Sequence, residues 1–329
     1  MFLRVWSGFI LTGTSLFTLN AELLNAMHHA HVIVAMHSIG SSIFMLYLFM
    51  HLLRNIMYRS YIHNSNVFVK GLIIYLLGMV VCFLGYSCNL ARMAYWALRV
   101  VINMLNFVGA ETFCMWFYGG YSVSVEMFPR VFVFHVLCAA ITVMLALYHM
   151  FLLHWTSSTT PGSNNGEGKR SMFYFIFVKD LFLVWLLDVC MVVFTIGLLN
   201  CLHPANNNPL IVCLDSMSRE IGNVEMVHHI VPEWYLLPIY MIIKLFPSRF
   251  LGLLLFVGTM IMIANLIKLN YYSRRFYMHA AMSSNWTRWT RVFITCILGA
   301  MGARRPIRFV IIYAKVLLLL WLLTLSGVN

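Results

Sequence analysis

Two pairs of histidines share one spacing in apolar stretches of the sequence. His37 and His51 are 14 residues apart, and so are His135 and His149. In an α-helix, this spacing returns to nearly the same face and separates the side chains by about 21 Å along the axis. Neutral imidazole is a strong ligand for iron. If the two helices face each other, they offer two His–His pairs, one above the other, that could hold haem iron.

Glycines repeat the spacing on the apolar stretch between the histidine stretches. Gly71 and Gly85 are also 14 residues apart. A glycine leaves a gap where a flat macrocycle can lie against the backbone. A lone histidine in a membrane helix commonly makes a helix–helix hydrogen bond. One spacing that recurs on three successive helices instead favours two haems.

The pairing of the histidines indicates what the haems would do. His37 and His135 are assigned to one haem, and His51 and His149 to the other. Iron held by two histidines has no open position, so it transfers electrons and does not activate oxygen. Arg54 lies one turn beyond His51. It either pairs with a haem propionate or snorkels from the end of the span.

The composition places these stretches in a membrane. Of 329 residues, 62% are hydrophobic and only 10% are charged, whereas soluble domains carry about a quarter charged residues. The net charge of +12 is attributed to Lys and Arg beside the spans and not to nucleic-acid binding. The eight cysteines include no CxxC or CxxCH, which argues against a zinc ribbon and against c-type haem.

The predicted fold is an all-α polytopic membrane protein with about eight transmembrane helices, of which helices one to four form the haem-binding bundle. The expected spans are 4–20, 31–53, 67–87, 129–153, 176–200, 250–269, 290–303 and 307–325. We assign 1–200 to the di-haem bundle with helix five from 176, 201–249 to a loop, and 250–329 to a C-terminal three-helix region. A turn is expected at 302–306.

Basic residues in the loops predict the orientation. The excess of Lys and Arg after spans two, four and six puts these loops on the negative side of the membrane. His37 and His135 then lie near the positive side, and His51 and His149 near the negative side. Three arginines break the rule: Arg304, Arg305 and Arg308.

Groups suited to proton transfer lie at both edges. His154 ends span four and Asp180 begins span five, near the second haem. Glu233 lies between Pro232 and the aromatic pair Trp234–Tyr235, which suits a proton acceptor with a raised pKa. Each group has a simpler explanation: interfacial charge for His154 and Asp180, and a helix start for Glu233.

The motifs resemble the cytochrome b family of ubiquinol–cytochrome c reductases. Residues 229–235 (HIVPEWY) resemble its PEWY signature, and 37–54 resemble its second helix. Supporting matches are Trp116, Gly119, Gly120, Arg130, the loop Gly162-Ser163-Asn164-Asn165, and Ile10-Leu11-Thr12-Gly13. The chain departs from the family's pattern at Asn89-Leu90-Ala91, where the family has PWG, and at Val34 and Ala139.

The resemblance implies a proton-translocating quinol–cytochrome c reductase subunit with two haems, bL (His37, His135) and bH (His51, His149). Quinol would be oxidised at the positive side and quinone reduced at the negative side. The implied site residues are Glu233, Tyr235, Pro232, Trp234 and Ala97 for quinol, Asp180, His154 and Lys179 for quinone, and Gly13, Gly71, Gly85 and Arg54 for haem.

The implied partners are an iron–sulphur (Rieske-type) subunit, a cytochrome c1-type subunit, accessory subunits, a second copy of the complex, and membrane lipids including cardiolipin. The expected location is the mitochondrial inner membrane, with a bacterial plasma membrane as the alternative. Two other functions remain open: a di-haem anchor of another quinone-linked oxidoreductase, and a metal or proton transporter. The anchor has no need of PEWY, and the transporter has no need of the glycines.

Overall fold

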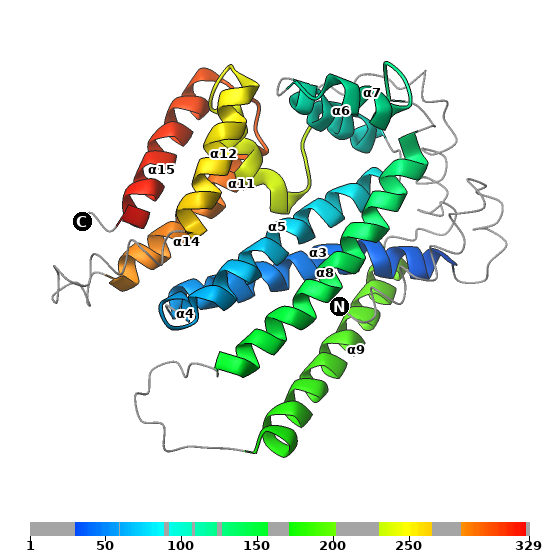
Figure 1. The fold of residues 1–329 in the computed structure, drawn as a ribbon, viewed down its shortest axis with the longest axis vertical. Coiled ribbons are helices and arrows are strands. Elements are labelled where there is room, and N and C mark those ends of the chain that lie inside the picture. The colour runs from blue at the N-terminus through cyan, green and yellow to red at the C-terminus, as the bar shows by residue number, and fades with distance from the viewer. Residues whose placement is uncertain are drawn as a thin grey trace. The chain divides into compact units, whose positions relative to one another are not determined.

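Regular structure in the described part of this computed structural model is helical throughout (Figure 1), which confirms the all-α fold. Three helices there are long and apolar enough to cross a membrane: Met36–Met57, Ser65–Ser87 and Pro129–Trp155. The number of eight spans stays a prediction, and the expected span 4–20 lies outside the described residues. The structure describes residues 30–58, 60–88, 92–106, 109–123, 127–156, 171–201, 230–264 and 284–326.

The chain divides into two compact units. One comprises Met1–Leu46 and Thr160–Asn223, and the other Tyr47–Thr159 and Val224–Asn329. In the first unit, a π-helical turn, η2 (Met172–Phe177), leads directly into α9 (Val178–Cys201). The helix α3 (Ala30–Met57) starts in the first unit and ends in the second. The predicted division at residues 200 and 249 stays a prediction.

Two long helices of the second unit pack against each other and carry Gly71, Gly85, His135 and His149. These are α5 (Ser65–Ser87), which follows the short α4 (Ser60–His63), and α8 (Phe128–Thr156). Both are apolar around most of their circumference, which is typical of helices buried in protein or lipid. Their contact brings residues near 71 and 85 beside residues near 149 and 135.

The described residues between α5 and α8 include two helices. These are α6 (Arg92–Asn106) and α7 (Glu111–Tyr118). Gly119 ends α7 at φ 75°, a left-handed conformation that favours glycine at a helix end. Arg130 on α8 donates to the carbonyl oxygens of Trp116 and Phe117. A cation from the next helix thus caps the last turn of α7.

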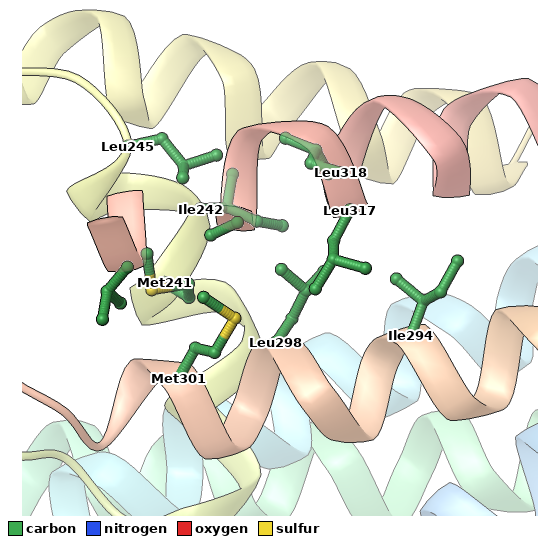
Figure 2. Packing of buried hydrophobic residues seen from close by; sticks show 10 residues of the cluster. Met241, Ile242, Leu245, Ile294, Leu298, Met301, Leu317 and Leu318 are labelled. Atoms are coloured by element: carbon green, nitrogen blue, oxygen red, sulfur yellow. The ribbon is translucent and has the colours of Figure 1, made fainter. Parts of the chain in front are cut away.

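The C-terminal part of the second unit has a core of its own. It contains α11 (Leu237–Lys244), α12 (Arg249–Ala264), α14 (Ser284–Gly302) and α15 (Arg308–Ser326). The break between α14 and α15 agrees with the predicted turn. Figure 2 shows side chains from α11, α14 and α15 directed toward one another: Met241, Ile242, Leu298, Met301, Leu317 and Leu318. Burying each contributes about 1.5–3 kcal/mol.

Candidate functional site

His135 is held on α8 by the backbone of α5. Its Nδ1 lies 2.9 Å from the carbonyl oxygen of Val81. A carbonyl can only accept, so Nδ1 carries the proton and the lone pair is on Nε2, the atom a metal would bind. A Cβ built on Gly85 would lie 2.7 Å from Cε1 of His135. Glycine is therefore needed at 85 for the imidazole to reach the carbonyl.

The same arrangement occurs one repeat away on the same two helices. A Cβ on Gly71 would lie 3.0 Å from Cε1 of His149. The backbone of Val67 faces this ring, and Val67 and Val81 are again 14 residues apart. Within the described residues, however, the buried Nδ1 of His149 has no hydrogen-bond partner of normal geometry. The two imidazole sites are thus similar in plan and differ in their hydrogen bonding.

His51 and His149 have the separation that two axial ligands of one iron need. Their ring centroids are 6.5 Å apart, with the planes at 78°. A metal–imidazole bond is about 2 Å long and the ring centre lies roughly 1 Å beyond the nitrogen, so two opposed ligands need about 6 Å. These residues therefore fit haem iron. Asn55 donates to the carbonyl of His51 at 2.8 Å and lies 3.4 Å from its Nε2.

Several predicted site residues belong to the other unit or lie outside the described residues. His37 lies on α3 in the first unit, whereas His135 lies in the second, so their pairing stays a prediction. Lys179 and Asp180 lie in the first turns of α9, also in the first unit. Gly13 lies outside the described residues.

Two residues assigned to the second haem's surroundings are exposed. His154 lies in the last turn of α8 and is exposed. Arg54 is exposed in the last turn of α3, where its guanidinium carbon lies 5.6 Å from the centre of the Tyr58 ring. Its pairing with a haem propionate stays a prediction.

The PEWY segment lies beside the C-terminal end of α5. Glu233 precedes a short 3-10 turn, η4 (Trp234–Leu236), that runs into α11. Burial raises the pKa of Glu233 above its ordinary value. Burial also raises the pKa of Tyr235, and the nearby groups Cys82, Glu233 and Tyr86 add to that rise. The carboxyl group is thus near Tyr86, the residue that follows Gly85.

The other residues assigned to the quinol site differ in exposure. Tyr235 is buried, Pro232 is half-buried and Trp234 is exposed. Ala97, on α6, is buried. Its role at the quinol site stays a prediction.

Sequence reasoning missed the carbonyl oxygen of Val81 that accepts from His135, and the neighbours Cys82 and Tyr86. A carbonyl oxygen carries no residue-type signal. The only sign of this carbonyl in the sequence is Gly85, four residues later, which leaves the carbonyl oxygen accessible to the imidazole. Cys82 and Tyr86 are separated from Glu233 by about half the chain, so only the fold brings them together.

Comparisons with known proteins identify two family models that match this chain. Residues 5–157 match the family model described as Cytochrome b/b6/petB, and residues 222–322 match Cytochrome b(C-terminal)/b6/petD. The cytochrome b of Brachionus plicatilis is 30% identical over 88% of this chain and 76% of its own length. That of Dictyostelium citrinum is 30% identical over 98% and 87%.

The fold also resembles a solved structure. A chain titled "Hyperthermophilic respiratory Complex III" superposes with a TM-score of 0.76 at 18% identity, covering 99% of this chain and 86% of that one. At this identity the likeness concerns the fold alone. The two family-model matches and the relatives, taken together, show that this chain belongs to the cytochrome b/b6 family.

Proposed function

We propose that this chain is the di-haem b subunit of a ubiquinol–cytochrome c oxidoreductase. It oxidises ubiquinol at the positive side of the membrane and reduces quinone at the negative side, and this couples electron transfer to proton translocation. The observation that carries the proposal is the position of Glu233 and Tyr235 beside Tyr86, next to the Gly85–His135 contact. A proton acceptor and a predicted haem ligand thereby lie at one end of α5.

The imidazoles hold the cofactor. Membership of the cytochrome b family implies haem b, and we assign His51 and His149 to one haem and His37 and His135 to the other. Haem, when bound, supplies one-electron transfer between the two quinone sites. The carbonyl of Val81 keeps the proton of His135 on Nδ1, so that Nε2 is presented as the ligand.

Glu233 takes a proton at the oxidising site. Oxidation of a quinol releases two protons with two electrons, so a base must lie within hydrogen-bond reach of its hydroxyl groups. Burial raises the pKa of Glu233, which makes its carboxylate a stronger base than an exposed one. The pKa of Tyr235 is raised too, so its hydroxyl stays protonated and acts as a donor.

Reduction of a quinone takes up two protons with two electrons, so nearby groups must donate protons to its oxygens. Asp180 and His154 are assigned to the reducing site, where they deliver protons to the quinone oxygens. Lys179 is assigned to binding of the quinone. The proposed partners follow from the reaction: a Rieske-type subunit and a cytochrome c1-type subunit accept the electron that leaves the chain. We place the complex as a homodimer, with accessory subunits and anionic lipids such as cardiolipin, in the mitochondrial inner membrane.

Isolation of the complex from its native membranes tests the function. We expect two b-type haems per chain by reduced-minus-oxidised spectroscopy and pyridine haemochrome assay, together with ubiquinol–cytochrome c reductase activity. Two haems without that activity would favour a di-haem anchor of another oxidoreductase. Absence of haem would contradict the redox assignment altogether and favour a transporter.

A further inference from the structure

The helix that follows the PEWY segment ends on a lysine that reaches the end of another helix. Nζ of Lys244, the last residue of α11, donates to the carbonyl oxygens of Gly302 at 3.0 Å and Arg304 at 3.4 Å. Carbonyls at a helix C-terminus lack partners within the helix and carry partial negative charge. Lys244 therefore caps α14 from α11, although burial lowers its pKa to about 8.

The same ammonium group lies over an aromatic ring that holds the backbone before Glu233. Nζ of Lys244 is 3.9 Å from the centre of the Tyr240 ring, a close cation–π contact. The hydroxyl of Tyr240 donates to the carbonyl of Ile230 at 3.1 Å. This bond closes a loop of chain that contains residues 231–236, including Glu233.

The start of α11 also rests on the end of α14. A Cβ built on Gly302 would collide with the carbonyl oxygen of Leu237, and one on Gly299 would lie 3.4 Å from Cγ of Pro238. Leu237 follows directly after η4. Glycine at 302 thus lets the backbones of α11 and α14 meet just beyond the PEWY segment, beside the core shown in Figure 2.

We propose that Lys244 is a positioning residue for Glu233, because it links the C-terminal end of α14, through the Tyr240 ring, to the backbone at Ile230. The inference rests on the proposed quinol-oxidising role of Glu233. Lys244 touches neither quinol nor haem. It fixes the ring whose hydroxyl holds the chain before Pro232, and so fixes where the carboxyl group is presented.

Substitutions of Lys244 in the intact complex test this role. Lys244→Met keeps the length of the side chain and removes the cation, whereas Lys244→Arg keeps the charge and the donors. We expect Lys244→Met to lower kcat/KM for ubiquinol about ten- to hundredfold, the effect of a small misplacement of a reacting group. Both haem bands should persist, and Lys244→Arg should restore most of the rate.

A second lysine gives a matched control. Lys315 on α15 lies over the Phe246 ring at 4.9 Å and is exposed. Lys315→Met removes a lysine–aromatic contact in the same group of helices, and we expect kcat/KM to stay within about twofold of the wild type because surface pairs contribute little. An equal loss in both variants would overturn the specific role of Lys244.

Coupling between Lys244 and Tyr240 separates a positioning role from a general loss of stability. Tyr240→Phe keeps the ring under Lys244 and removes the hydroxyl that holds Ile230. If the two residues act in series, the double variant should lose little more activity than the stronger single variant. Additive losses would overturn the proposal. If Lys244→Met does not assemble, unchanged kcat/KM in Tyr240→Phe would overturn it instead.

The outcome also distinguishes this inference from the function on which it rests. A wild-type complex without ubiquinol–cytochrome c reductase activity contradicts the function. An active wild type with an equally active Lys244→Met variant contradicts only the role of Lys244.

Discussion

The two imidazole sites along α5 and α8 follow one plan but differ in how firmly the ring is held. At the Gly85 site, Nδ1 of His135 has a carbonyl partner at 2.9 Å, and a methyl group at Gly85 would come within 2.7 Å of the ring. At the Gly71 site the approach is 3.0 Å, and Nδ1 of His149 makes no normal hydrogen bond within the described ranges.

This difference shows that a repeated motif need not give equivalent sites. A histidine whose Nδ1 donates to a carbonyl has a fixed tautomer, a fixed ring orientation and a more basic Nε2. We expect the His135 site to be the more rigid of the two. The His149 ring is oriented chiefly by packing against Gly71.

Removal of a ligand gives the largest expected effect. We expect His149→Ala to abolish one of two b-haem signals and His135→Ala to abolish the other, because an iron without its second imidazole loses bis-histidine coordination. Difference spectra and haem content per chain measure this. The control His154→Ala should keep both haems. A variant at 149 that retained both signals would show that the repeated spacing does not mark the ligands.

The next effect concerns Glu233, the proposed base for quinol oxidation. Because burial raises the pKa of Glu233 above its ordinary value, the carboxylate is lost at a higher pH than for an exposed glutamate. Quinol oxidation should therefore fall as pH decreases through that raised pKa. Glu233→Gln should lower the rate by roughly 10²- to 10⁴-fold and remove this acid limb.

Glu111, an exposed glutamate in the first turn of α7, gives the control. Glu111→Gln should leave both the rate and the pH profile unchanged. An acid limb that survived in Glu233→Gln would assign the base to another group.

A smaller effect is expected at the proposed reducing site. Asp180→Asn removes a proton donor and should slow reoxidation of the haem held by His51 and His149 by about 10²-fold. Reduction of the other haem should proceed normally. Stopped-flow absorbance in the two b-haem bands follows both steps. Asp188→Asn, on the same helix and half-buried, is the control, and equal slowing in both variants would reject a specific role for Asp180.

The smallest expected effect is the difference between the substitutions Gly71→Ala and Gly85→Ala. Gly85→Ala forces a methyl group against the His135 ring and disturbs its bond to Val81, an overpacking cost of about 1–3 kcal/mol. Gly71→Ala should destabilise the protein less, because its added methyl group would lie 3.0 Å from the His149 ring, compared with 2.7 Å between a methyl group at Gly85 and the His135 ring. Haem retention and the electron paramagnetic resonance g-values of the ferric haems measure the difference.

Gly258→Ala on α12 is the matched control, since a Cβ there meets no atom within 4 Å. It should leave both haem signals as in the wild type. Equal perturbation by Gly71→Ala and Gly85→Ala would remove the distinction between the two imidazole sites.

The residues that repeat in the sequence were predictable, and those that act through the backbone were not. Two histidines or two glycines that are 14 residues apart lie on nearly the same face of one helix, because an α-helix has about 3.6 residues per turn. The carbonyl of Val81, which accepts from His135, leaves no such pattern.

Contacts between distant segments were also beyond sequence reasoning. Tyr86 and Glu233 are near enough to interact electrostatically only in the folded chain. From the sequence alone, Lys244 would be interpreted as a snorkelling cation at a helix end. The all-α fold and the apolar helices followed from composition and periodicity. The pairing of His37 with His135 remains a prediction from the spacing.

The cap that Lys244 places on α14 also sets an order of events during synthesis. Its acceptors, the carbonyls of Gly302 and Arg304, lie 58 and 60 residues further along the chain. At roughly 5–20 residues per second, the ribosome needs about 3–12 s to make them. During that interval the PEWY segment exists without the helix end that holds it. The PEWY segment thus gains its link to the end of α14 only after α5 and α8 have both been synthesised.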